Sequence, residues 1–308
     1  MKRALALALL YLLAAGPAPS QNRQPYPAGD DTARRNVFIV VIDGIRFSEA
    51  FPMQDLNLPH IWNDLRPAGT IFNNFTNEGE TVTCPGHAAF LTGEYEDLPN
   101  DGSKRPSFPT LFEYFRAQTG SPRSSCYDIP GKKKLHMLAY STDSGYGEEY
   151  GARYLSPGSA TDTATWSILS TIMDEEHPRL VIVNFPGVDI VAHDSDWTGY
   201  LGAMRTADSL VYLLWMKIQS DGFYKNRTAM FVSSDHGRHD NAHGGFQHHG
   251  CPCRGCRHII GLGVGPRFRP GAVVDDPVRQ TDVQSAAARL LSIHIPDRGF
   301  VDILTDRP

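Results

Sequence analysis

Residues 37–42 read Val-Phe-Ile-Val-Val-Ile, and Asp43-Gly44 follow directly. Six consecutive apolar residues, most of them β-branched, are typical of a strand that is buried on both faces of a sheet. Similar apolar runs occur at residues 135–140, 180–185, 229–233 and 259–264. Helical patterns lie among these runs, at residues 110–117, 161–176, 204–219 and 281–291. The alternation predicts an α/β fold, a three-layer αβα sandwich with a largely parallel central sheet.

The N-terminal residues have the three zones of a secretory signal. Met1-Lys2-Arg3 is basic, residues 4–15 are apolar, and Ala18-Pro19-Ser20 is a small-residue cleavage site. The apolar run is shorter than the roughly 20 residues that a spanning helix needs. We therefore expect a signal peptide at residues 1–20, a flexible leader at 21–35 and a single catalytic domain at 36–308. The mature protein should be exported, to the periplasm or the medium, with no membrane span after signal cleavage.

The composition argues against nucleic-acid binding and limits how the cysteines can pair. The chain has 308 residues and a net charge of -5, which gives no basic surface for nucleic acid. It has 5 cysteines, so at least one cannot pair within the chain. Cys251, Cys253 and Cys256 are close enough for a zinc knuckle or a tight disulfide loop. We favour a disulfide between two of them in an exported protein, with Cys126 pairing with the third.

Metal-ligating residues follow the predicted strands. They are Asp43 after the first strand, Asp189 and His193 after residues 180–185, Asp235 and His236 after residues 229–233, and His249 farther on. Each alone is better read as a cap, a turn residue or a satisfied histidine. The carboxyl ends of parallel strands meet at one edge of a sheet, so together these side chains predict a common site. Three carboxylates and three imidazoles predict two metal sites, and this mixture suits zinc better than magnesium.

A second motif, residues 81–87, reads Thr-Val-Thr-Cys-Pro-Gly-His. Pro85 and Gly86 suit a turn, and a helical pattern follows from His87. Thr83 should therefore lie at or just before a helix N-terminus, where backbone amides and the helix dipole favour phosphate. A threonine hydroxyl becomes a nucleophile only with a base or a metal beside it. The alternative is that Thr81 or Thr83 merely caps the helix.

These motifs together resemble the alkaline phosphatase superfamily, and within it the branch of nucleotide pyrophosphatase/phosphodiesterases and phosphate-irrepressible alkaline phosphatases. The resemblance also includes the final His-Gly and the helical segment from Thr281. It implies an alkaline phosphatase-like fold, a phosphothreonine intermediate at Thr83 and two Zn²⁺ per chain. The implied ligands are Asp43, Asp235, His236 and Thr83 for one zinc, and Asp189, His193 and His249 for the other.

Two departures from the family pattern matter. The last ligand is ambiguous because His239, His243, His248 and His249 all lie near Asp235; His249 is chosen because Gly250 follows it, and His243-Gly244 is the runner-up. Cys84 lies beside the nucleophile, which is similar to the Cys-x-Pro-x-Arg motif of sulfatases. Here Thr83 occupies the attacking position and His87 replaces the arginine, so a sulfatase is disfavoured.

The substrate is expected to be a small-molecule phosphate ester. Asn100 is placed like the family asparagine that donates to a phosphoryl oxygen, although it also fits a turn. Lys132 and Lys134 enter the apolar run at 135–140, and as alternate residues of a strand they would converge on one phosphate. This favours phosphomonoesters; the alternative for these lysines is an exposed basic turn. A phosphodiesterase would instead use Trp197 and Tyr200 beside the leaving group, and a non-catalytic binding protein would be expected to lack Thr83 or a ligand.

Overall fold

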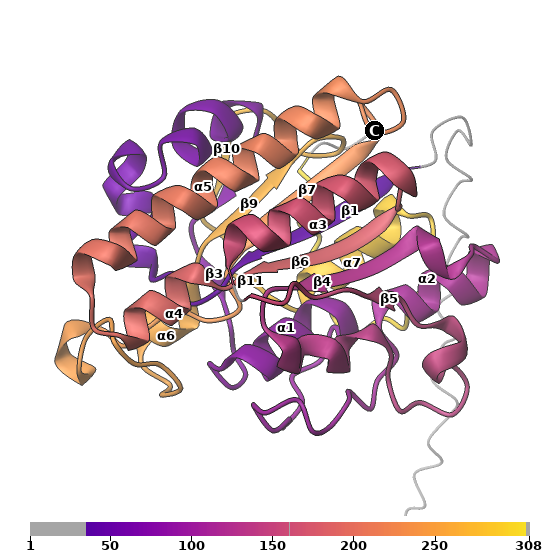
Figure 1. Ribbon diagram of the computed structural model, residues 1–308, viewed down its shortest axis with the longest axis horizontal. Helices are drawn as coiled ribbons and strands as arrows, with labels where there is room; N and C mark the ends of the chain where they lie inside the picture. Colours follow the sequence, from indigo (N-terminus) through magenta and orange to yellow (C-terminus); the bar gives the residue numbers. More distant parts are fainter. Residues whose placement is uncertain (1–34, 160, 306–308) are drawn as a thin grey trace, which may run out of the picture. The chain divides into compact units, whose positions relative to one another are not determined.

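The computed structural model describes residues 35–159 and 161–305, and its main feature is an eight-stranded sheet (Figure 1). The strands lie in the order β10-β2-β9-β7-β1-β6-β4-β5. Their bounds are Asn36–Ile42 (β1), Gly69–Phe72 (β2), Cys126–Pro130 (β4), Arg153–Tyr154 (β5), Leu180–Phe185 (β6), Thr228–Ser233 (β7), Gly261–Val264 (β9) and Ala272–Val274 (β10). The β1 strand pairs in parallel with β6 and β7, whereas β9 is antiparallel to both its neighbours. The predicted, largely parallel α/β sheet is confirmed.

The side chains of β1 alternate between two hydrophobic cores. Val37, Ile39 and Val41 pack on one face with α1, α2 and α7, and the other residues of the strand pack with α3 and α5 on the opposite face. Figure 1 shows α3 and α5 in front of the sheet. The helix bounds are Thr83–Thr92 (α1), Leu111–Thr119 (α2), Asp162–Glu175 (α3), Gly187–His193 (α4), Trp197–Ser220 (α5), Arg254–Arg257 (α6) and Asp282–Leu290 (α7). A strand that is apolar on both faces thus requires a layer of helices on each side.

The predicted strand at residues 135–140 is wrong. The structure has a 3-10 helix at Lys133–Ala139, and the sheet strand of this region is β4, which lies before it. Leu135, Met137, Leu138 and Ala139 are all buried, a pattern that does not alternate. A short apolar run can form either structure, and periodicity alone does not distinguish them. The argument that Lys132 and Lys134 share one face of a strand fails with it.

The apolar run at 259–264 is divided between two sheets. Its first part forms β8 (His258–Ile259), which belongs to a small sheet with β3 (Phe75–Thr76) and β11 (Val278–Arg279), and the rest forms β9. The helix predicted at 204–219 begins earlier, at Trp197, where the Asp196 side chain accepts a hydrogen bond from Gly199 N. Glycines at 199 and 202 weaken the helical pattern there.

The predicted disulfides are absent: all five cysteines are free thiols. Cys126 is fully buried in β4, where the strand pairing fixes its position. The predicted signal at residues 1–20 lies outside the described residues, as does the leader apart from Arg35. No helix in residues 35–159 and 161–305 has both the length and the apolar character to span a bilayer. The described residues form one compact unit, and the domain boundaries stay a prediction.

Candidate active site

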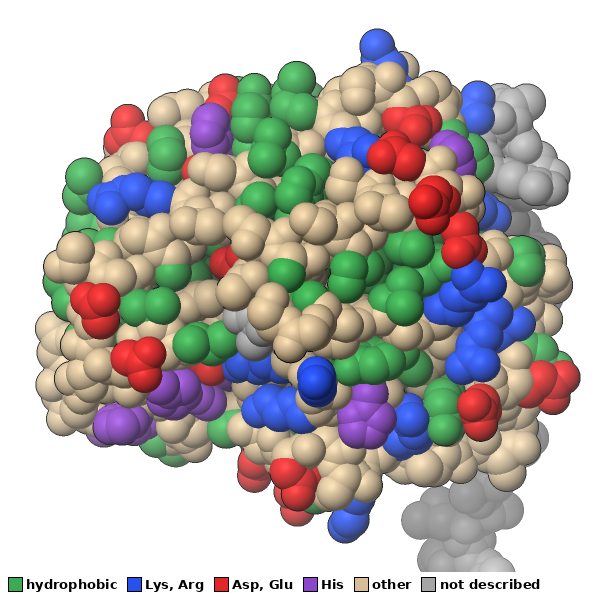
Figure 2. Space-filling model, viewed as in Figure 1, with side chains coloured by type: hydrophobic (Ala, Val, Ile, Leu, Met, Phe, Trp, Pro, Cys, Tyr) green, Lys and Arg blue, Asp and Glu red, His purple; other side chains and the backbone are tan. Residues whose placement is uncertain are grey.

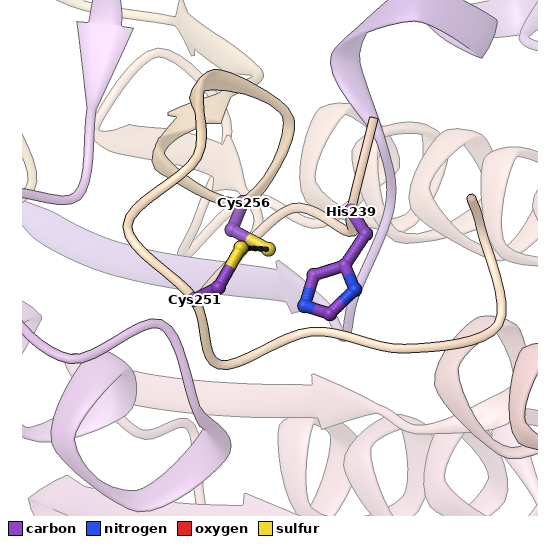
Figure 3. A group of neighbouring side chains, drawn as sticks. All are labelled: His239, Cys251 and Cys256. Atoms are coloured by element: carbon purple, nitrogen blue, oxygen red, sulfur yellow. Dashed lines mark hydrogen bonds between the residues drawn. The ribbon is translucent and has the colours of Figure 1, made fainter. Parts of the chain in front are cut away.

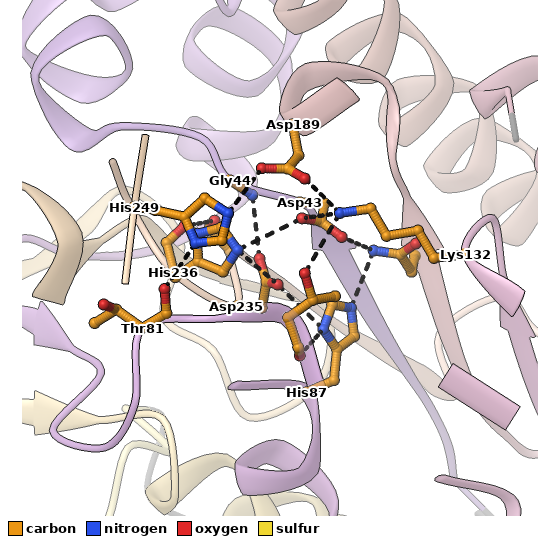
Figure 4. A network of polar contacts seen from close by, with 12 residues as sticks. Asp43, Gly44, Thr81, His87, Lys132, Asp189, Asp235, His236 and His249 are labelled. Atoms are coloured by element: carbon orange, nitrogen blue, oxygen red, sulfur yellow. Dashed lines mark hydrogen bonds and ion pairs between the residues drawn. The ribbon is translucent and has the colours of Figure 1, made fainter. Parts of the chain in front are cut away.

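The six ligands suggested by the sequence come together beyond the carboxyl ends of β1, β6 and β7. Figure 4 labels five of them, all except His193. They form two groups, in each of which the possible ligand atoms lie within 4.8 Å of one another. The first group is Asp43, Asp235 and His236, all buried; the second is Asp189, His193 and His249. The sequence groupings and the spatial groupings therefore coincide.

Two histidines have one ring nitrogen fixed by the backbone. His236 Nδ1 lies 2.8 Å from the carbonyl oxygen of Gly237, and His249 Nδ1 lies 2.9 Å from that of Thr81. Each Nδ1–H donates to its carbonyl, which leaves the Nε2 lone pair for a metal. His236 Nε2 and Asp235 Oδ2 are buried, lie 3.3 Å apart and have no hydrogen bond partner among the described residues. His87 Nδ1 lies 3.2 Å from Asp235 Oδ2, but it is closer to the carbonyl oxygen of Thr83, at 2.8 Å. Such atoms are costly unless a ligand satisfies them, so the first group fits a cation.

The second group is more exposed. His193 Nε2 lies 3.2 Å from His249 Nε2 and 3.4 Å from Asp189 Oδ1. Burial and the nearby His236 lower the pKa of His249 to about 3, which keeps this imidazole neutral and able to bind a metal. The alternative ligand, His243, lies outside this group and pairs with Asp240 at 2.6 Å. The structure thus places His249 and not His243 with Asp189.

Thr83 is the first residue of α1, so the helix starts four residues before the predicted His87. Its side chain caps no amide, because Val82 is the N-cap residue and has no capping bond. Gly86 packs beneath Asp235, where an added Cβ would lie 2.4 Å from the Asp235 carbonyl oxygen. This close approach brings the first turn of α1 against the first ligand group. Thr83 is therefore adjacent to the metal ligands with a hydroxyl that is not needed for capping.

The helix N-terminus offers fewer free amides than the sequence suggests. The Cys84 N–H donates to Asn100 Oδ1 at 2.9 Å, and the Gly86 N–H donates to the Val82 carbonyl at 3.0 Å. Pro85 has no N–H to offer. The helix dipole remains favourable for an anion. Burial raises the pKa of the Cys84 thiol to about 11, so this neighbour of Thr83 is a poor nucleophile at neutral pH.

Lys132 links the two ligand groups. Its Nζ donates to Asp43 Oδ1 at 2.9 Å and to Asp189 Oδ2 at 2.5 Å, and lies 3.4 Å from Thr83 Oγ1. Lys134 has a different partner, donating to Asn100 Oδ1 at 3.0 Å. The two lysines therefore have different partners, Lys132 among the carboxylates and Lys134 beside Asn100. Their convergence on one phosphate stays a prediction.

Three further residues support the ligands and were missed in the sequence. Arg238 is fully buried, and its guanidinium donates to Asp189 Oδ1 and to the carbonyl of Gln247. Asn184 donates to Asp43 Oδ2 at 2.8 Å, and His87 Nδ1 lies 3.2 Å from Asp235 Oδ2. Signals existed for two of them, since Asn184 interrupts an apolar strand and Arg238 directly follows Asp235-His236-Gly237.

The site has an excess of negative charge. Asp43, Asp189 and Asp235 face two permanent cations, Lys132 and Arg238. Burial, with the charge of Asp235, raises the pKa of Asp43. Burial also opposes ionisation of Asp189, but the contacts with His193 and Lys132 outweigh it and depress the pKa of that carboxyl. Additional cations would relieve the repulsion between Asp43 and Asp235.

The aromatic residues beyond His193 have separate roles. Tyr200 is buried, and its hydroxyl accepts a hydrogen bond from Arg46 N at 2.9 Å, so it belongs to the core. Trp197 is 41% exposed and lies with its ring 4.8 Å from that of Phe246. Trp197 and Phe246 are therefore the pair available to a bound group. An open cavity of about 380 Å³ is lined by Thr81 and Gly250, among others, and by none of the six candidate ligands.

Known proteins resemble this chain in part of its sequence and in its fold. Residues 114–253 match the family of type I phosphodiesterases / nucleotide pyrophosphatases. The resemblance to the alkaline phosphatase superfamily is confirmed. A protein of that superfamily from Vibrio parahaemolyticus has a TM-score of 0.62 and 14% identity, covering 85% of this chain and 67% of its own. No curated protein matches the chain in sequence.

Two other solved structures share the fold. The phosphonate monoester hydrolase of Silicibacter pomeroyi has a TM-score of 0.62 and 13% identity, covering 89% of this chain and 77% of its own. A 2-O GAG sulfatase has a TM-score of 0.65 and 13% identity, covering 88% of this chain and 74% of its own. At such identities the likeness shows an alkaline phosphatase-like fold alone, and the activity has to be argued from the site.

Proposed function

We propose that this protein is a phosphate-ester hydrolase in which Thr83 is the nucleophile and two zinc ions are bound by the two ligand groups. The observation that carries the proposal is the position of Thr83, a buried hydroxyl at the N-terminus of α1 beside both groups. The proposed ligands are Asp43, Asp235 and His236, with Thr83, for one zinc and Asp189, His193 and His249 for the other. Their mixed oxygen and nitrogen donors favour zinc over magnesium.

The unsatisfied His236 Nε2 and Asp235 Oδ2 and the excess of carboxylates support the presence of cations. When bound, zinc would lower the pKa of a hydroxyl and neutralise charge on the transferring phosphoryl group. In the protein's own part of the reaction, Thr83 Oγ1 forms a bond to phosphorus while the bond to the leaving oxygen breaks. A monoester gives phosphothreonine and a diester gives phosphothreonine that still carries its second ester group; the leaving alcohol takes up the threonine proton. Attack of water on the same phosphorus then releases phosphate, or a phosphomonoester from a diester, and restores the threonine.

The surrounding residues position these atoms. Lys132 supplies a positive charge 3.4 Å from Thr83 Oγ1, where negative charge develops during the transfer. The oxygen of Asn100 is used by Cys84 N and Lys134 Nζ, which fixes the orientation of its amide group. Its NH₂ group remains available as a donor to a phosphoryl oxygen. Asn184 and Arg238 keep the carboxylates of Asp43 and Asp189 in place.

We infer that phosphodiesters are the better substrates, because residues 114–253 match the phosphodiesterase family. Trp197, which follows His193 in the next helix, packs against Phe246 and keeps an exposed apolar ring. The monoester preference expected from the sequence is the second candidate. Lys132 favours it, since a cation next to Thr83 would assist a dianionic substrate. Against it, this lysine already neutralises Asp43 and Asp189, and Lys134 is engaged by Asn100.

A kinetic comparison tests both the hydrolase mechanism through Thr83 and the preference for diesters over monoesters. The zinc-loaded protein is assayed with an aryl phosphate monoester and with the matching diester, and a quenched reaction is analysed by mass spectrometry for phosphate on the peptide containing Thr83. We expect hydrolysis with phosphothreonine and a higher kcat/KM for the diester. A higher value for the monoester would support the second candidate. Absence of hydrolysis with both substrates would favour a non-catalytic binding protein.

Export is a further part of the proposal and rests on the zones of residues 1–20. Intact-mass measurement of protein collected outside the producing cytoplasm should give a chain that starts at Gln21. Protein recovered only from the cytoplasm with residues 1–20 attached would contradict it.

A further inference from the structure

The loop that follows the candidate active site contains a second cluster of metal-binding side chains. His239, Cys251 and Cys256 each offer a ligand atom, and the three atoms lie within 4.8 Å of one another. Figure 3 shows the imidazole ring beside the two sulfur atoms. None of these residues belongs to the ligand groups of the proposed hydrolase.

The two sulfur atoms are at the separation expected for ligands of one metal ion. Cys251 Sγ and Cys256 Sγ lie 3.9 Å apart. Two Zn–S bonds of about 2.3 Å at a tetrahedral angle place their sulfurs roughly 3.8 Å apart. A disulfide would need about 2.05 Å between them. The observed separation therefore matches shared coordination more closely than a covalent bond.

His239 is the second observation that indicates a ligand. Both of its ring nitrogens are buried, and neither has a hydrogen bond partner among the described residues. A buried imidazole needs an acceptor for its N–H and usually a partner for its other nitrogen. By contrast, His236 and His249 each have Nδ1 on a backbone carbonyl. The unsatisfied ring of His239 lies next to two thiols, and a metal ion there would satisfy it.

Cys253 can complete the set. Its thiol interacts with those of Cys251 and Cys256, and its backbone N–H donates to Cys251 Sγ at 3.4 Å. Cys253 also forms a group with Asp240 and His243, in which the possible ligand atoms lie within 4.8 Å of one another. That group is less suitable for a metal, because Asp240 already caps a short helix and pairs with His243.

We propose that His239, Cys251, Cys253 and Cys256 bind a structural zinc ion separate from the catalytic pair. Three thiolates and one imidazole form a closed tetrahedral set with no open position, which is typical of structural zinc. Binding releases the thiol protons to solvent and involves no change of oxidation state.

The proposed structural zinc lies in the loop that carries His249. Its ligands flank His249, with His239 before it and Cys251 after it, and the backbone pairs across the loop through His239 N to His248 O at 2.8 Å. Arg238, which contacts Asp189, directly precedes His239. The zinc would thus fix the loop that supplies one catalytic ligand and supports another. Its loss should weaken zinc binding at Asp189, His193 and His249 by about ten- to a hundredfold, the usual effect of losing outer support.

X-ray absorption at the zinc edge on the intact, zinc-loaded protein tests the site without relying on activity. Sulfur neighbours at about 2.3 Å can arise only from cysteines, because the proposed catalytic ligands are oxygen and nitrogen at about 2.0–2.2 Å. We expect a sulfur shell in the wild type and in Asp43→Ala, and its reduction or loss in Cys251→Ser and Cys256→Ser. Cys126→Ala, a buried cysteine elsewhere, should keep it.

The wild-type spectrum is sufficient to overturn the proposal, even if a variant fails to fold. A zinc-loaded wild type without a sulfur shell would do so, as would a Cys251–Cys256 disulfide found by non-reducing mass analysis. A sulfur shell in a protein without hydrolase activity would leave this site established and would contradict only the proposed catalytic function.

Discussion

Arg238 and Asp189 form a buried ion pair in which the guanidinium donates to the same carboxylate that contacts Lys132. Arg238 is fully buried and also donates to the carbonyl of Gln247 at 2.9 Å. The pair therefore connects the loop before His249 to α4, the helix that follows β6. Arg238 thus orients a proposed metal ligand through contacts that a side chain of different shape would lose.

Replacing Arg238 should therefore be costly. Arg238→Met leaves Asp189 with one fewer partner, and breaking a buried pair in this way typically costs about 3–5 kcal/mol. We expect a lower free energy of unfolding by urea denaturation and weaker zinc binding by calorimetry. Arg153→Met is the matched control, since Arg153 pairs with Glu176 at an exposed position. Equal effects of the two substitutions would show that the buried pair has no special role.

Thr83 and Cys84 give a direct test of the nucleophile. Thr83→Ala removes the attacking hydroxyl and should reduce kcat by about a thousandfold or more. Thr83→Ser keeps a hydroxyl and should retain measurable turnover. Cys84→Ala should remain active, because burial raises the pKa of this thiol to about 11. Steady-state kinetics of the three variants would refute the assignment if Cys84→Ala were the inactive one.

Gly86 provides a test of how α1 is placed. In Gly86→Ala the new Cβ would lie 2.4 Å from the Asp235 carbonyl oxygen, so the helix or the loop has to move. Overpacking of this kind costs about 1–3 kcal/mol. Gly202→Ala is the control, because α5 has nothing within 4 Å of the added Cβ, and it should be neutral or slightly stabilising. Thermal unfolding of both variants measures the difference, and a stable, fully active Gly86→Ala would contradict the close packing.

Lys132 and Lys134 form a matched pair with different partners. Lys132→Met removes a cation 3.4 Å from Thr83 Oγ1, and a charge-assisted contact of this kind is worth roughly 1.5–3 kcal/mol. We expect kcat/KM to fall by about tenfold or more, with a larger fall for the monoester than for the diester. Lys134→Met should have a smaller effect, exerted through Asn100. Unchanged values of kcat/KM for Lys132→Met would show that this lysine does not contribute to catalysis.

The fold could be predicted because each strand is indicated by residues that are adjacent in the sequence. Each of β1, β6 and β7 is an apolar run buried on both faces, and the ligand residues follow these strands directly in the sequence. The failures involve contacts between distant segments. Nothing local distinguishes the 3-10 helix at Lys133–Ala139 from a strand. The position of Arg238 after Asp235-His236-Gly237 indicates that it is near the site, but not that its partner is Asp189. The five free thiols likewise reflect spatial positions and not spacing.

Topology also sets the order in which the molecule can be built. The β1 strand is central, yet its partners Leu180–Phe185 and Thr228–Ser233 come much later in the chain. During synthesis the first strand leaves the ribosome well before either neighbour exists, and pairings between distant segments form slowly. An incomplete chain that ends before residue 180 can therefore form neither the centre of the sheet nor the meeting of Asp43 with Asp235. The central sheet can therefore form only after β6 and β7 have been synthesised, and the proposed metal sites can form only after that.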